Sequence, residues 1–154
     1  MSLKPSSALR ASLNIDRAAR LRVPAAAVML LVVEVGLKVL GFPRLLRFLR
    51  LPLRDSRARP PADAQDVLSE RERSIVDAVE LVVRARPREG RCLRRALILG
   101  WHLRSRAPLL RIGVERENGA VSAHAWIEID GQPVAAGNKL ERFAPLGRSM
   151  PHVT

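Results

Sequence analysis

Cys92 is the only cysteine in this 154-residue chain, and its position suits a nucleophile. It lies in "RCLRRALILGWHLRSRAP", just after Gly90, where the pattern predicts the start of a helix. A helix N-terminus carries partial positive charge and unpaired N–H groups, which stabilise a thiolate and could hold an oxyanion. The alternative is a structural role, because free cysteines are often small hydrophobic members of a core.

His124 is the best candidate for a base that would act on this thiol. In "VSAHAWIEID" the alternation places Ala123, Ala125, Ile127 and Ile129 on one face of a strand and His124, Trp126 and Glu128 on the other. We expect the helix that starts near Cys92 to pack on the side of His124, where the imidazole would take the thiol proton and later donate it to a leaving amine. A purely structural histidine is the alternative.

The sequence also gives expectations for Trp126, for Glu128 and for the two other histidines. Trp126 would either shield the pair from water or serve as an ordinary cross-strand packing residue. Glu128 is expected to be a solvated strand residue. His102 lies roughly 280° around the helix from Cys92 at 100° per residue, so it should face elsewhere. His152 falls in an irregular tail.

The cysteine and histidine, with their order and separation, resemble the transglutaminase-like cysteine proteases. More narrowly, they are similar to the B proteins of lasso-peptide biosynthesis. The resemblance covers roughly residues 65–138 and rests on "CLRRALILGWHLRSRAP", "LLRIGVERENG" and "AHAWIEIDGQPV"; "GFPRLLRFLRLPLR" also looks like that family. It implies a bacterial, cytoplasmic cysteine protease that cleaves the leader from a ribosomally synthesised precursor peptide during its maturation. It also implies a separate leader-binding protein and an ATP-dependent lasso cyclase as partners, with no cofactor in this chain.

The third catalytic residue is where the sequence departs from that family. The family's Asp position is occupied here by Ala136. Asp130 lies about 20 Å from His124 along an extended strand, too far unless the chain bends sharply. With a three-residue turn after Ile129, Asn138 falls opposite His124 and could orient the imidazole; a two-residue turn would place Gly137 there. The candidate catalytic set is therefore Cys92, His124 and Asn138, with Asp130 or no third residue as alternatives.

The surrounding pattern predicts an α+β fold, with N-terminal helices and a catalytic helix packed on a small antiparallel sheet. Helices are expected over about 24–40, with Pro24 in the first turn, over "RLLRFLRL" after Pro43, over about 66–85 and from near Cys92. "LLRIGVERE" and "VSAHAWIEID" read as a hairpin, and "DG" at 130–131 as a turn into a short strand.

A Pro-rich charged stretch, "RDSRARPPADAQ", predicts a division of the chain. The first part would be a basic helical region and linker over 1–64, and the second the protease core over 65–154.

The composition bears on partners and compartment. The net charge of +12 favours acidic partners, whereas 3% aromatic residues equip the chain poorly for stacking on bases, so no nucleic acid is expected. "VPAAAVMLLVVEVGLKVL" is interrupted by Glu34 and Lys38, which predicts a buried helix, with peripheral contact with a membrane surface as the alternative. No signal-peptide pattern, zinc-ligand spacing or phosphate-binding loop is present. The second hypothesis for the whole chain is a non-catalytic basic adaptor that binds an anionic membrane surface or nucleic acid.

Overall fold

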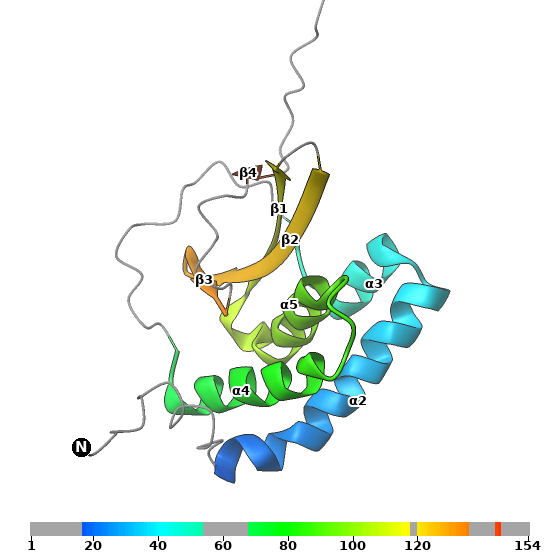
Figure 1. Cartoon of the computed structure of the whole chain (residues 1–154). Helices are drawn as coiled ribbons and strands as arrows, with labels where there is room; N and C mark the ends of the chain where they lie inside the picture. The colour runs from blue at the N-terminus through cyan, green and yellow to red at the C-terminus, as the bar shows by residue number, and fades with distance from the viewer. Residues whose placement is uncertain (1–16, 54–67, 118–119, 136–143, 146–154) are drawn as a thin grey trace, which may run out of the picture.

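A computed structural model describes residues 17–53, 68–117, 120–135 and 144–145. In these segments the helices gather on one side of a small sheet (Figure 1). The elements are, in order, α2 (Arg17–Val39), α3 (Phe42–Leu49), α4 (Glu70–Arg84), α5 (Arg91–His102), a 3-10 turn (Arg104–Arg106), β1 (Leu109–Glu117), β2 (Ala120–Ile129), β3 (Gln132–Val134) and β4 (Ala144–Pro145). The predicted α+β architecture, with a helix packed on a small antiparallel sheet, is confirmed.

Helix α2 begins at Arg17, earlier than the sequence pattern predicts. Pro24 was expected in the first turn but lies inside the helix. A proline in a helix interior costs about 3 kcal/mol because it removes a backbone hydrogen bond and crowds the preceding turn. Ala19 and Ala26, on either side of it along the chain, are both buried. Tertiary packing thus offsets the local cost of Pro24.

Helix α4 begins with a complete capping box. The Ser69 hydroxyl accepts from the Glu72 N–H, and the Glu72 carboxylate accepts from the Ser69 N–H at 2.8 Å. Glu72 also accepts from the Arg106 guanidinium at 3.0 Å, which ties α4 to the turn after α5. The helix was expected from about residue 66; this cap fixes its first residue at Glu70 instead.

Helix α5 is the central element of the helical layer. It contacts α2, α3 and α4 as well as β1 and β2. Five consecutive residues, Ala96 to Gly100, are buried. Gly100 allows a close approach, because a Cβ there would lie 2.7 Å from the Leu51 side chain. This packing holds the first turn of α5 in a fixed place beside the sheet.

The sheet has the strand order β3-β2-β1-β4, with antiparallel pairing throughout. On β1, Gly113 stands opposite His124. The turn between β2 and β3 contains two residues, Asp130 and Gly131, with φ of 52° and 78°. Two positive φ values are typical of the tight hairpin turn that matches strand twist. Both predicted hairpins are confirmed.

The helices on both sides of the predicted division share one hydrophobic core. Its buried members come from α2 and α3 (for example Val33 and Leu45) and from α4, α5 and the sheet (for example Val79, Leu97 and Ile127). The predicted boundary at residues 64 and 65 lies outside the described residues.

Candidate active site at the start of α5

Gly90 shapes the turn that presents Cys92. Its backbone is left-handed, with φ 67° and ψ 11°, and no side chain caps the helix at this position. A Cβ at Gly90 would also lie 2.7 Å from Nη1 of Arg94. Cys92 is the second residue of α5 and is partly buried. The predicted placement of the thiol in the first turn of a helix is confirmed, and with it the favourable field of the helix N-terminus.

The thiol lies at an edge of β2. Its Sγ is 3.9 Å from the carbonyl oxygen of Ala123. Among the described residues, β3 pairs with β2 over Ile127–Ile129. Every second residue of a strand directs its backbone groups toward the same neighbouring strand, and Ala123 lies four residues before Ile127. Its carbonyl therefore points toward the β3 side of β2, beyond the last described pair of residues between β2 and β3. Cys92 therefore approaches β2 where its backbone extends past β3.

The imidazole of His124 meets the thiol at this edge. A hydrogen bond with His124 is the main reason that the pKa of Cys92 is lowered; burial acts in the opposite direction, and the N–H of Ala125, the His124 charge and the N–H of Leu93 lower it further. The structure thus brings together the two residues that the sequence singled out.

The face of β2 on which α5 packs differs from the prediction. Helix α5 does not pack on the face that carries His124. It packs on the opposite, aliphatic face, where Ala125, Ile127 and Ile129 join the core with Leu97. The physical reason is that this arrangement removes both the apolar side of α5 and that aliphatic stripe from water. Only the first turn of α5 reaches the strand edge.

The face of β2 that carries His124 holds a buried polar network. The rings of His124 and Trp126 are stacked, with centroids 6.0 Å apart and planes at 23°. Trp126 Nε1 donates to Glu128 Oε1 at 3.2 Å, and Arg111 Nε donates to Glu128 Oε2 at 2.7 Å. The predicted solvated character of Glu128 is wrong: its side chain is 4% exposed. Arg111 on β1 supplies the charge that makes this burial tolerable.

Trp126 contacts the imidazole directly. The sequence left open whether it shields the site or simply packs between strands. It is buried and covers one face of the His124 ring, while its indole N–H is held by Glu128. The network therefore restrains the orientation of the ring that meets Cys92.

The candidates for a third residue are placed differently. Asp130 lies in the β2–β3 turn and accepts from Arg106 Nη2 at 3.0 Å. The turn has two residues, so the three-residue turn on which the prediction of Asn138 rested does not hold. Ala135 has a positive φ of 50°, which departs from strand geometry. Ala136, Gly137 and Asn138 lie outside the described residues.

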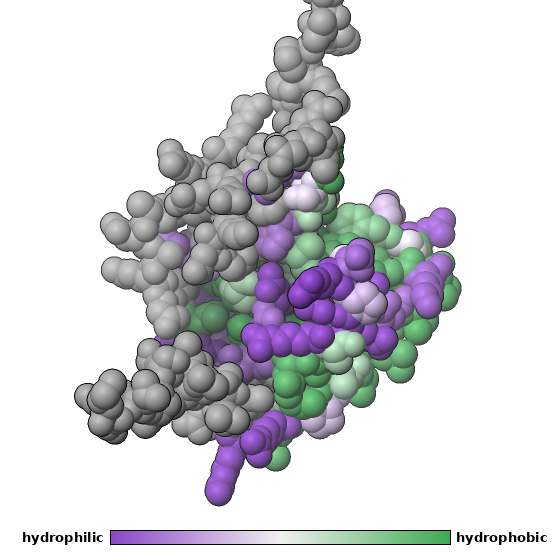
Figure 2. Space-filling model, viewed as in Figure 1, coloured by the Kyte–Doolittle hydropathy of each residue, from purple (hydrophilic) through white to green (hydrophobic). Residues whose placement is uncertain are grey.

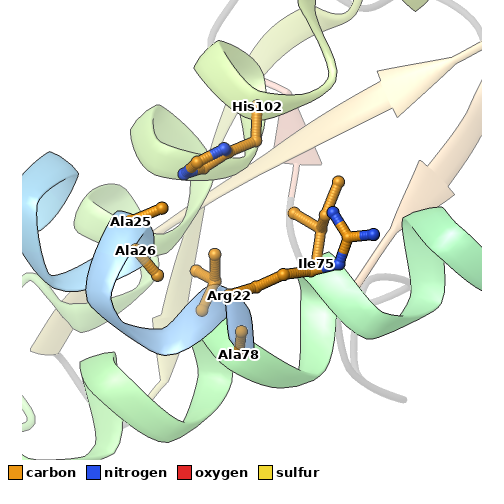
Figure 3. A pocket seen from close by; sticks show the side chains of 7 residues that line it. Arg22, Ala25, Ala26, Ile75, Ala78 and His102 are labelled. Carbon is orange, nitrogen blue, oxygen red and sulfur yellow. The ribbon is translucent and has the colours of Figure 1, made fainter. Parts of the chain in front are cut away.

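His102 lines a separate cavity. It lies about 15 Å along α5 from Cys92, at 1.5 Å per residue. The cavity, of about 70 Å³, lies between α2, α4 and α5, and Arg22 and Ile75 also line it (Figure 3). Burial and the charges of Arg104 and Arg22 lower the pKa of His102. His152 lies outside the described residues.

Two further properties hold for the described residues. They contain no group of three or more His, Cys, Asp or Glu side chains that could hold a metal ion. None of their helices has the length and apolar character needed to cross a bilayer.

A family model described as the transglutaminase-like superfamily matches residues 28–148, which include both Cys92 and His124. The chain belongs to this superfamily. Comparison with curated proteins and with solved structures gives no match. The transglutaminase-like superfamily generally contains enzymes of the cysteine-protease type. The match begins inside α2, so it takes in most of the helical layer as well as the sheet.

Proposed function

We propose that this transglutaminase-like protein is a cysteine peptidase, and that it removes the leader from a ribosomally synthesised lasso precursor peptide. The observation that carries the peptidase proposal is the meeting of Cys92 and His124 at the edge of β2, where their hydrogen bond lowers the thiol pKa. A core thiol would not need such a partner. The lasso assignment is supported by the resemblance of "CLRRALILGWHLRSRAP" and "AHAWIEIDGQPV" to that family.

The reaction would begin with transfer of the thiol proton to His124. The Cys92 sulfur then attacks the scissile carbonyl carbon, and the developing oxyanion would be held by the backbone N–H of Cys92. Collapse of this intermediate breaks the C–N bond as the His124 imidazolium donates its proton to the leaving amine. Water, deprotonated by His124, attacks the thioester, releasing the leader carboxylate and returning the proton to the thiol.

Orientation of His124 would come in part from Trp126. The stack covers one face of the imidazole, and the buried Glu128–Arg111 pair holds the indole in place. The two-residue β2–β3 turn does not favour Asn138, which lies outside the described residues and stays a prediction for the group that accepts from the far imidazole nitrogen. It is tested by kcat of Asn138→Ala, which should fall while KM stays unchanged; an unchanged kcat would remove Asn138 from the site.

The partners follow from the same proposal. A separate leader-binding protein would deliver the precursor, and a cyclase that consumes ATP would close the ring after cleavage. We place the protein in the bacterial cytoplasm, where a reducing environment would keep the lone thiol of Cys92 available. The net charge of +12 would assist docking on acidic patches of leader or partner, so higher salt should weaken that complex; a salt-insensitive titration would contradict this.

The proposal is tested by incubating the protein with a candidate precursor and its leader-binding protein and following the products by mass spectrometry. The parent protein should release the leader, and Cys92→Ala should not. Ser105→Ala, an exposed change in the turn after α5, is the matched control and should cleave like the parent. Equal cleavage by the parent and Cys92→Ala would overturn the peptidase assignment. A different result is a precursor that stays intact in all samples while alkylation shows that the pKa of the Cys92 thiol is lowered. That result would overturn the lasso substrate and leave the peptidase assignment standing.

A further inference from the structure

Helix α2 has a second apolar face that the fold does not use. Six large aliphatic side chains of this helix are exposed, and two of them are more than two-thirds exposed, Leu21 at 82% and Val39 at 71%. The other four are Val28, Leu31, Val32 and Val35. Figure 2 shows this apolar surface over the part of the molecule that α2 and α3 form.

This exposed face is distinct from the face that builds the core. At 100° per residue, the six side chains fall within an arc of about 100°. The buried residues Ala26, Met29 and Val33 lie on another side of the helix, which packs against α4 and α5. The exposed face is therefore surplus to the stability of the described fold, and an aliphatic patch of this extent marks an interaction surface.

The charged residues of α2 and α3 are almost all positive. Glu34 is the one acidic residue in the sequence of α2 and α3, and it accepts from Arg94 Nε of α5 at 2.6 Å. The exposed cations lie toward the ends of α2 and along α3: Arg17, Arg20, Lys38, Arg44 and Arg47. Phe48 of α3, 60% exposed, adds an aromatic side chain next to Arg47 in the sequence. An apolar centre with cationic flanks matches a helix that lies in the headgroup region of a bilayer.

The same charges argue against the other occupants of such a face. A second copy of this chain would bring its own Arg and Lys residues against these, which is unfavourable in a self-complementary interface. A partner protein on this face would have to supply its own acidic groups, and vesicles free of protein would then leave this chain unbound. We propose that α2 and α3 dock the protein on an anionic lipid bilayer, lying along its surface without crossing it.

The experiment is a flotation assay of the full chain with lipid vesicles. Vesicles of phosphatidylcholine with about 30% phosphatidylglycerol supply the anionic surface, and pure phosphatidylcholine is the comparison. The parent protein should float with the anionic vesicles and much less with the neutral ones, and added salt should weaken the binding. Circular dichroism of each variant checks that it is folded.

Two sets of variants separate the apolar and the cationic contributions. Leu31→Glu with Val35→Glu should weaken binding to anionic vesicles by about tenfold or more, since it removes apolar contact and adds negative charge. Arg44→Gln with Arg47→Gln should weaken binding to anionic vesicles alone. The matched control is Val121→Glu, a change at an exposed aliphatic residue of β2, and it should bind like the parent.

Three results would overturn the proposal. One is a parent protein that floats with neither kind of vesicle. Another is flotation that the Leu31→Glu/Val35→Glu variant retains in full. The third is vesicle-independent self-association that these substitutions abolish, which would assign the face to a second copy. None of these results depends on peptide cleavage, so they leave the peptidase proposal untouched.

Discussion

The sulfur of Cys92 lies 3.9 Å from the carbonyl oxygen of Ala123, the residue that precedes His124. This contact fixes the start of α5 against the edge of β2, so the thiol and the imidazole meet even though α5 packs on the opposite face of the strand. The chemistry proposed for the protein depends on this edge contact more than on the packing of either element as a whole.

The turn at Gly90 should be needed for the reactivity of Cys92. Gly90→Ala places a Cβ at a left-handed φ and against Arg94, so we expect a loss of about 1–2 kcal/mol in the free energy of unfolding and slower alkylation of Cys92. Gly131→Ala is the matched control, because its φ is also positive but its Cβ would meet nothing within 4 Å. It should lose similar stability and keep the alkylation rate. Equal alkylation rates in both variants would contradict a specific role for Gly90.

Trp126 should act on the reaction through His124. Trp126→Leu removes the stack on the imidazole and should lower kcat by about tenfold or more with a smaller effect on KM. Trp126→Phe keeps an aromatic face but loses the N–H that Glu128 accepts, so it should retain more of kcat. Steady-state kinetics and the pH profile of kcat/KM measure this. A loss of stability with an unchanged kcat would show that Trp126 is a packing residue.

Glu128 should be a stability determinant. Glu128→Gln removes the carboxylate charge that accepts from the buried Arg111 Nε and should cost about 3–5 kcal/mol in the free energy of unfolding. Replacing both partners, with Arg111→Met and Glu128→Leu, should recover most of this loss because the charges of this buried pair are removed together. Urea denaturation of the parent, the single variant and the double variant provides the comparison. A Glu128→Gln variant as stable as the parent would count against a buried ion pair here.

His102 should make stability depend on pH. Its pKa is lowered in the folded protein from 6.5, mainly by burial, so below pH 6.5 the unfolded chain takes up a proton more readily than the folded one. The free energy of unfolding should therefore fall as the pH drops below 6.5. His102→Gln, which cannot titrate, should reduce this fall. Parallel curves of stability against pH for the parent and the variant would contradict the assignment.

The sequence singled out Cys92 and His124 because each residue carries a local signal. Cys92 follows a glycine at a helix start, and His124 stands out from an aliphatic alternation on its strand. The meeting of the two at a strand edge was not predictable, because it depends on where β3 ends and on which face α5 covers. Arg111 and Glu128 were missed for a related reason. Each looks like an ordinary surface residue until the β1–β2 register places them on neighbouring strands of one buried face.

Pro24 and the β2–β3 turn show the limits of local rules. Proline at a helix start is a sound expectation, yet α2 already begins at Arg17, on the N-terminal side of Pro24. Ala19 in this earlier part of the helix is buried, and its packing stabilises the longer helix. The register of β3 depends on a single residue of turn length, and Asp130 with Gly131 provides the shorter turn. One residue in a loop therefore decides which position of the chain would stand opposite His124.

The most direct test of a shared proton between Cys92 and His124 is the rate of Cys92 alkylation by iodoacetamide, measured from about pH 5 to about pH 10. The thiolate is the reacting form, so the folded parent should reach half of its maximal rate at a lower pH than the same protein unfolded in urea. His124→Ala removes the main cause of the lowered pKa and should move this midpoint upward. A midpoint that is the same in the parent, the variant and the unfolded chain would contradict the account.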